Sequence, residues 1–127
     1  MEYGITRTVD LPYEAAVQRV TEELKNQGFG VLTTIDVKET LKQKLNVEFT
    51  KYVILGACNP PLARRALEVE MNIGLLLPCN VIVYEKDRKT VVGAFDPLMM
   101  VPLVGKPEMA SIAADVKRRL ETVLANI

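Results

Sequence analysis

The stretch Tyr52-Val-Ile-Leu-Gly-Ala-Cys58-Asn59-Pro60-Pro61 joins a nearly continuous apolar run to a signal for the start of a helix. An apolar run of this length is typical of a strand that is buried on both faces of a sheet. Asn59 is a favoured N-cap, and the two prolines suit the first helical turn, where an amide hydrogen has no partner anyway. The stretch therefore predicts a central strand, Phe49 to Cys58, followed at once by a helix.

Two further runs, rich in β-branched residues, flank a charged turn. We predict strands over Val81 to Glu85 and Thr90 to Phe95, with an exposed turn at Lys86 to Lys89. Strands joined this closely pair in the antiparallel direction. Tyr3 to Val9, which alternates apolar and polar residues, and Phe29 to Ile35 complete the predicted sheet.

Helices are predicted between these strands and at the C-terminal end. The first opens at Pro12 and closes at Gly28, a short one covers 36–44, and the last begins at Pro107. The order β-α-β-(short α)-β-α-β-β-α indicates an α+β fold, with an antiparallel sheet packed against helices. The apolar stripe of the last helix consists of Met109, Ile112, Ala113, Val116, Leu120, Val123 and Leu124.

Composition narrows the classes of function. The chain has 127 residues, 16 Lys and Arg, 16 Asp and Glu, two Cys and no His. This length fits a single domain over residues 1–127. Zero net charge without a basic stripe argues against nucleic-acid binding. The absence of His excludes Ser-His-Asp and Cys-His catalysis and His-ligated metals.

The apolar segments also indicate where in the cell the protein is expected. Pro97 to Gly105 is too short and too rich in proline to cross a bilayer, which needs about 20 apolar residues. Met1 to Asp10 lacks the apolar region of a signal peptide. We therefore expect no membrane partner and a cytoplasmic protein whose thiols are reduced.

The two cysteines form the first candidate site. Cys58 ends one predicted strand and Cys79 begins a later one, so antiparallel neighbours would bring both thiols to one end of the sheet, within disulfide reach. Cys58 also precedes a helix N-terminus, where the dipole favours a thiolate. Two interpretations remain open, a reactive dithiol or two small buried residues. Two Cys without His lack the four ligands of zinc, so we predict no metal site.

The segment after the last strand is the second candidate. Residues 98–104 are apolar, and they either pack under the last helix or line a ligand pocket or a subunit contact, where flexible methionines are useful. Asp96, at the strand end, is a candidate catalytic acid, an anchor for this segment, or a turn residue.

Several pieces of the sequence resemble one family. Tyr52 to Ala63, Ala66-Leu67 and Leu76 to Val83 look like the signature of the Domain of Unknown Function 302 family, and the Cys-Asn-Pro and Leu-Pro-Cys-Asn pieces are distinctive. Gly28-Phe-Gly-Val-Leu and Asp96-Pro97 also fit. The resemblance implies a small prokaryotic domain of the TATA-binding-protein fold class, with a curved antiparallel sheet against helices. It implies no function, because the family is named for lacking one, and fold likeness does not transfer DNA binding.

Two functions are compatible with these residues. The first, which we favour, is a non-enzymatic binding module without a cofactor, for a small molecule or a protein. It is favoured because, without His, a general base would have to be Asp, Glu or Lys. The second is a thiol-dependent redox or sensor protein, with Cys58 as the more polarised thiol and Cys79 as its partner. A homodimer through residues 97–104 or an edge strand is left open. In the thiol-dependent function, the supporting polar groups would be Asn59, Asn80 and Asp96.

Overall fold

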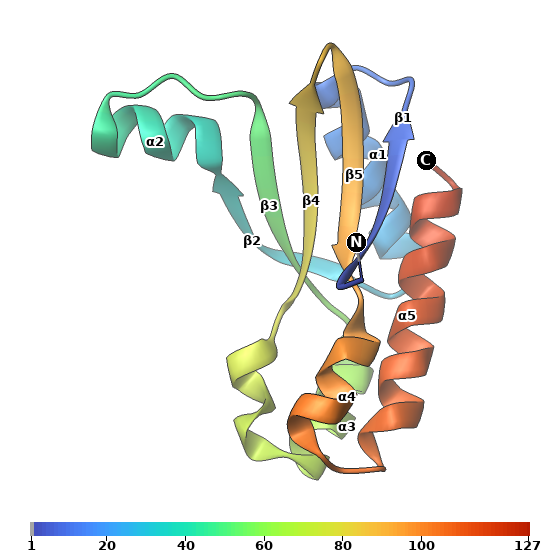
Figure 1. Cartoon of the computed structure of the whole chain (residues 1–127). Helices are drawn as coiled ribbons and strands as arrows, with labels where there is room; N and C mark the ends of the chain where they lie inside the picture. Colours follow the sequence, from blue (N-terminus) through green and yellow to red (C-terminus); the bar gives the residue numbers. More distant parts are fainter. Residues whose placement is uncertain (1) are drawn as a thin grey trace.

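The computed structural model describes residues 2–127 and contains a five-stranded antiparallel sheet with the strand order β1-β5-β4-β3-β2. The predicted α+β fold and element order are confirmed, and short helical segments lie before β4 and after β5 (Figure 1). The strands are β1 Gly4–Val9, β2 Gly30–Asp36, β3 Tyr52–Cys58, β4 Cys79–Lys86 and β5 Lys89–Phe95. The helices are α1 Tyr13–Asn26, α2 Val37–Leu45, α3 Pro60–Val69, η1 Met71–Leu76, η2 Pro97–Met99, α4 Met100–Val104 and α5 Met109–Ala125.

The main core lies between one face of the sheet and the helices α1 and α5. Strand residues alternate between the two faces, so every second side chain of β3, β4 and β5 enters this core. Each helix contributes residues spaced three or four apart. The buried strand residues are Val53, Leu55, Ala57, Val81, Val83, Val92 and Ala94, and the buried helix residues include Val20, Leu24, Leu120 and Val123.

The strand β3 differs from the prediction in one respect. Val53 and Leu55 are buried, whereas Tyr52 and Ile54, on the other face, are only half-buried. The prediction of burial on both faces is wrong, because α1 and α5 pack on one side of the sheet. β3 is an interior strand, but the middle position belongs to β4.

Left-handed backbone occurs at two turns that the sequence predicts, one after α1 and one between β4 and β5. Gly28 follows α1 with φ of +84°, as expected of a glycine that ends a helix. Asp87 and Arg88 have φ of 52° and 64° and form a tight two-residue turn between β4 and β5. Lys86 to Lys89 is exposed, as predicted.

The helix α2 projects away from the sheet together with the segments on either side of it (Figure 1). Asp36 caps α2, because its Oδ1 accepts a hydrogen bond of 2.9 Å from the amide of Glu39. None of the nine residues of α2 is buried. Ile35, Val47 and Phe49 are exposed beside it. We call residues 32–49 the α2 arm.

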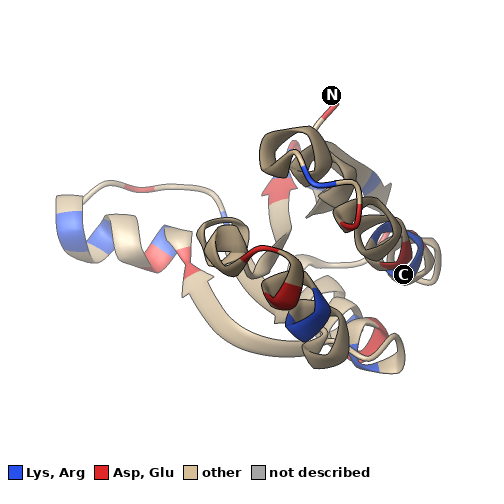
Figure 2. Cartoon of the chain, turned by 90° about the horizontal axis from the view of Figure 1, so that it is seen from below, with Lys and Arg blue, Asp and Glu red and all other residues tan. Residues whose placement is uncertain are grey.

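Charged residues of both signs are interspersed on the helices (Figure 2). On the α2 arm, the basic residues Lys38 and Lys42 both pair with Glu48, at 3.6 and 2.8 Å. Glu48 thus offsets part of the positive charge of these two lysines. Within residues 2–127, no helix combines the length and the hydrophobicity that crossing a bilayer requires.

Candidate functional site

A pocket of about 340 Å³ lies where β3 ends and β4 begins, between the sheet and the helices α3, α4 and α5. No charged side chain lines it, and its walls are almost entirely apolar. The sheet side is formed by Phe29, Leu32, Thr33, Ala57, Cys58, Leu77, Pro78 and Cys79. The helix side is formed by Asn59, Leu62, Ala63, Ala66, Leu67, Met100, Ile112, Ala113 and Val116.

Small side chains explain why this space is open. Ala63 and Ala66 on α3 and Ala113 on α5 all line the pocket. Alanine side chains fill less space than larger apolar side chains do, so they leave room between the helices and the sheet. From the sequence, Ala113 belongs to the apolar stripe of the last helix, and no pocket is predicted at these three alanines.

The two cysteines meet at one end of this pocket. β3 and β4 pair antiparallel, and Ala57, the residue before Cys58, lies opposite Cys79. Both cysteines line the pocket, and both are free thiols. Cys79 is buried and Cys58 is half-buried. The expectation that antiparallel neighbours bring the two thiols to the same end of the sheet agrees with this geometry.

The environment of Cys79 holds it in the neutral form. Burial raises the pKa of the Cys79 thiol to about 11, and the charge of a Cys58 thiolate adds a smaller contribution in the same direction. At neutral pH, Cys79 is therefore a protonated thiol and a poor nucleophile. Cys58 is the thiol that solvent reaches, and it stands just before the N-terminus of α3.

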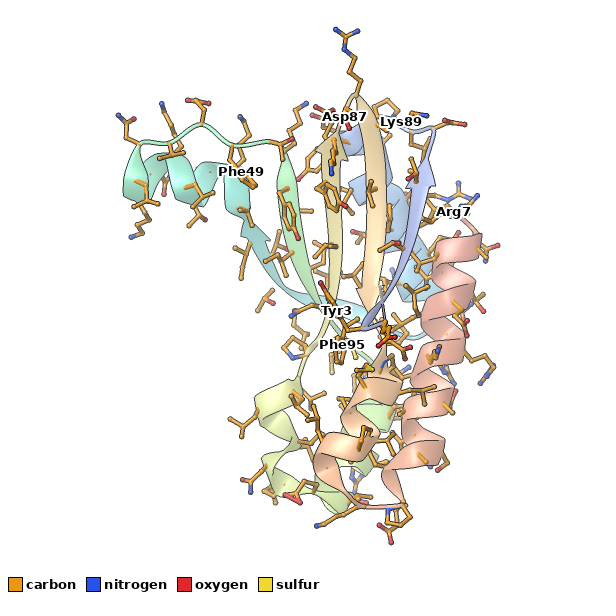
Figure 3. The ribbon with its side chains drawn as sticks, viewed as in Figure 1. Tyr3, Arg7, Phe49, Asp87, Lys89 and Phe95 are labelled. Carbon is orange, nitrogen blue, oxygen red and sulfur yellow. The ribbon has the colours of Figure 1, made fainter. Side chains whose placement is uncertain are left out.

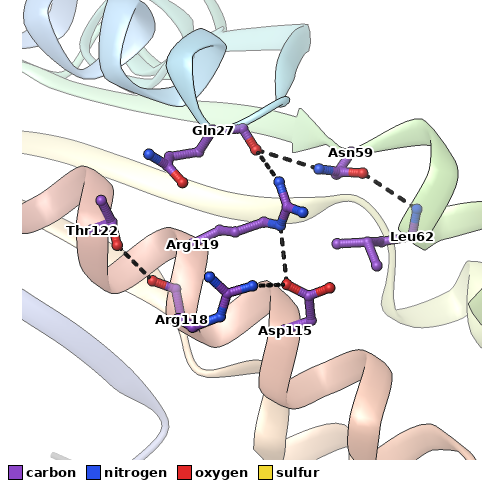
Figure 4. A network of polar contacts seen from close by, with 7 residues as sticks. All are labelled: Gln27, Asn59, Leu62, Asp115, Arg118, Arg119 and Thr122. Carbon is purple, nitrogen blue, oxygen red and sulfur yellow. Dashed lines mark hydrogen bonds and ion pairs between the residues drawn. The ribbon is translucent and has the colours of Figure 1, made fainter.

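Asn59 is buried and connects three helices (Figure 4). Its Oδ1 caps α3 by accepting from the amide of Leu62 at 3.3 Å, and its Nδ2 donates to the carbonyl of Gln27 at 3.4 Å. Arg119 of α5 donates to the same carbonyl at 3.0 Å and is itself held by Asp115. The amide of Asn59 is thus used to position the pocket wall.

Asn80 lies away from the thiols. Because its strand alternates, Asn80 points to the face opposite Cys79 and is exposed there. It lines a separate hollow of about 390 Å³ on the open face of the sheet, together with Tyr3 and Phe95. Figure 3 shows Tyr3 and Phe95 close together near that end of the sheet. The structure does not bring Asn80 to the thiol pocket.

Asp96 does not line the pocket with the thiols, and it anchors the segment that follows. Its Oδ1 accepts from the amide of Leu98 at 3.0 Å, and its Oδ2 forms an ion pair of 2.9 Å with Lys117 of α5. Among the three alternatives for Asp96, these contacts fit the anchor. They tie the end of β5 to the last helix.

The segment 97–104 is helical and forms η2 and α4. Pro97 and Met100 are buried, whereas Leu98 and Leu103 are exposed. Met100 reaches the pocket beside the thiols. The segment therefore does both: it packs against α5, and its residue Met100 forms part of the pocket wall.

A metal centre finds no support in this geometry. Within residues 2–127, no group of three or more His, Cys, Asp or Glu side chains is placed to hold a metal ion. Two thiols in an apolar wall leave a zinc ion short of its usual four ligands.

Comparison with known proteins places the chain in a family. The family model described as "Domain of unknown function DUF302" matches residues 5–127. The chain belongs to the DUF302 family. Its fold is similar to that of the crystal structure of an uncharacterized conserved protein DUF302 from Bacillus stearothermophilus, with 35% identity and a TM-score of 0.92. The similarity covers 99% of this chain and 98% of that chain. No match was found among curated proteins.

The pieces of sequence that resemble the DUF302 signature meet in space. Cys58-Asn59 and Leu77-Pro78-Cys79 are separated along the chain by α3 and η1, yet both line the same pocket. In this DUF302 chain these residues therefore line one pocket.

Proposed function

We propose that this chain is a binding module for a small, uncharged, apolar molecule, and that the pocket with the two thiols is its site. The observation that supports this most is the pocket of about 340 Å³ with almost entirely apolar walls. Ligand sites in proteins are typically clefts of about 300–1,000 Å³ that are lined by apolar residues, with a few polar groups for orientation. Here Cys58, Asn59 and Thr33 are the polar groups.

The chemistry of the walls defines the class of ligand. A charged molecule would lose its hydration in the pocket without gaining an ionic partner there, because no charged side chain lines it. Apolar walls also hold water poorly, so an apolar ligand displaces little that is bound well. We therefore infer that aromatic or aliphatic molecules are preferred to organic acids or phosphates.

The test is a fluorescence titration with 1-aminoanthracene, an uncharged apolar fluorophore. We expect saturable binding of one molecule per chain. Ala63 lines the pocket, so Ala63→Leu should weaken binding by about tenfold or more, as extra methylene groups in an apolar site do. Ala114 is exposed on α5 and does not line the pocket, so Ala114→Leu is the matched control. Unsaturable binding, or equal loss in both variants, would contradict the proposal.

A thiol-dependent function is the second candidate, and the shared pocket of Cys58 and Cys79 favours it. Reaction with an aromatic disulfide reagent should show one fast thiol, Cys58, because Cys79 is buried with a pKa of about 11. Cys58→Ser should abolish the fast phase. If Cys58→Ser leaves the fast phase in place, this candidate is rejected.

A further inference from the structure

We propose that the hollow on the open face of the sheet is a second binding site, and that it takes the adenine ring of an uncharged nucleoside. The hollow has a volume of about 390 Å³, and ligand sites typically measure about 300–1,000 Å³. It shares only Leu77 and Pro78 with the pocket that holds the thiols. The inference goes beyond the proposed function, because it concerns a different site and a different ligand.

Two glycines leave room for the hollow on β1 and β5. Gly4 pairs with Phe95 and Gly93 pairs with Thr6, and all four residues line the hollow. A Cβ at Gly93 would lie 3.1 Å from Cγ2 of Thr6 and 3.3 Å from Cγ1 of Ile82, both on the open face. At the two glycines the open face therefore carries no side chain, while the residues around them stand above it.

Two aromatic side chains, Tyr3 and Phe95, line the hollow and lie close together (Figure 3). The carbonyl of Tyr3 accepts a hydrogen bond of 2.9 Å from the amide of Asp96, which ties the segment before β1 to the end of β5. The Tyr3 side chain is nevertheless 63% exposed. Exposed aromatic rings are surfaces on which bases stack, because every base has a π face. This wall therefore favours a planar aromatic ligand.

Asn80 supplies the hydrogen-bonding edge of the site. Its side chain is exposed on the open face and lines the hollow. Within residues 2–127 its amide takes part in no side-chain hydrogen bond, whereas the amide of Asn59 is used for two. An asparagine amide offers a donor beside an acceptor, and it pairs in a bidentate way with the amino group and N7 of adenine. Asn80 therefore selects a ring whose edge carries both.

The lack of charge in the hollow selects a neutral ligand. Among the described residues that line it, none has a charged side chain. A phosphate held there would lose hydration without gaining an ionic partner. Thr6 and Tyr3 add neutral hydroxyl groups, which suit the hydroxyl groups of a ribose. A nucleoside therefore fits the hollow better than a nucleotide or a nucleic acid does.

The test is isothermal titration calorimetry of the full chain with adenosine, purine riboside and AMP. Purine riboside has the ring system of adenosine but lacks the amino group. We expect one adenosine per chain. Purine riboside should bind about tenfold more weakly or worse, because it cannot form the bidentate pair with Asn80. AMP should bind within about threefold of adenosine, because the hollow offers its phosphate no ionic partner.

Substitutions test the role of each side chain. Asn80→Leu should weaken adenosine binding by about tenfold or more and leave purine riboside binding unchanged. Asn72→Leu is the matched control, because Asn72 is also exposed and does not line the hollow. Tyr3→Ala should weaken the binding of both ligands, because it removes a stacking surface. All three side chains are exposed, so urea unfolding midpoints close to that of wild type should confirm that the variants fold.

The outcomes separate this inference from the proposed function. Absence of saturable adenosine binding overturns the inference, as does an equal loss of adenosine and purine riboside binding in Asn80→Leu. AMP binding that is more than about tenfold tighter than adenosine binding would assign the hollow to phosphate-bearing ligands and overturn the neutral class. Displacement of 1-aminoanthracene by adenosine would place adenosine in the pocket with the thiols and overturn the second site. Failure of 1-aminoanthracene to bind, with the adenosine results as expected, overturns only the proposed function.

Discussion

At the scale of single residues, the junction behind the pocket depends on backbone that only glycine adopts easily. Gly28 has φ of +84°, and a Cβ built there would lie 3.0 Å from Nδ2 of Asn59. Asn59 in turn caps α3 and lines the pocket. A change at Gly28 therefore reaches the pocket wall through one side chain.

We expect Gly28→Ala to destabilise the protein by about 1–3 kcal/mol, because it combines a strained backbone with a close contact. Gly105 has φ of +72° but no atom within 4 Å of its Cβ position, so Gly105→Ala isolates the backbone cost. Gly30→Ala has neither effect. Urea unfolding should rank the losses Gly28 above Gly105 above Gly30; equal losses at Gly28 and Gly105 would mean that Asn59 moves away freely.

The buried thiol predicts a pH effect. The pKa of Cys79 is raised from 9.0 to about 11, so the folded state holds this proton more tightly than the unfolded state does. The stabilisation is therefore complete below pH 9 and is lost as the pH rises through about 11. Two pKa units correspond to at most about 3 kcal/mol.

The measurement is the free energy of unfolding between pH 8 and pH 11 for wild type and Cys79→Ala. The variant should lose stability less steeply over the upper part of this range. Other groups that titrate there are common to both proteins, so their effect cancels in the difference. Parallel curves would show that water reaches the Cys79 thiol.

At the scale of elements, the two faces of β3 contribute differently to the free energy of unfolding. Leu55 is 2% exposed in the main core, whereas Ile54 is half-buried on the other face. Leu55→Ala should cost about 2–5 kcal/mol by cavity formation. Ile54→Ala should lower the free energy of unfolding by less, because folding removes the Ile54 side chain from water only in part. Urea unfolding of both variants checks this, and a larger loss at Ile54 would reverse the assignment of the core face.

The ends of helices and the position of the hairpin turn were predictable from the sequence, because local chemistry determines them. Asn59, Asp36 and Gly28 mark helix ends by their own hydrogen bonds or backbone preference, and the Lys86–Lys89 turn marks a hairpin. Both cysteines line one pocket, as expected if their strands are antiparallel neighbours. The pocket was not predictable, because it depends on how α3 and α5 lie across the sheet. Asn80 and Asp96 were assigned to the site by strand position alone, without regard to the face they occupy.

At the scale of the whole molecule, the α2 arm packs little against the rest of the described chain. A nine-residue helix is marginal in water by itself, and none of the residues of α2 is buried. The exposed apolar residues of the arm continue from β2, an edge strand of the sheet. Edge strands pair readily with a second copy, so we expect two chains to associate through β2 and the arm.

Sedimentation velocity tests this association. Wild type should sediment as a dimer, and the double variant Leu45→Lys with Phe49→Lys should be a monomer, because both residues are exposed on the arm. Leu103→Lys is the control: Leu103 is 71% exposed on α4, in the segment that was the alternative interface. A monomeric Leu103→Lys with a dimeric arm variant would assign the interface to that segment instead.

The central claim is that the pocket between α3, α5 and the ends of β3 and β4 receives an apolar ligand. The most direct test is a crystal structure of the reduced protein with 1-aminoanthracene. We predict ring density against Ala63, Ala66 and Ala113, beside the two thiols. Density only in the hollow of the open face, against Tyr3 and Phe95, would contradict the claim, as would a pocket that stays empty at saturating ligand.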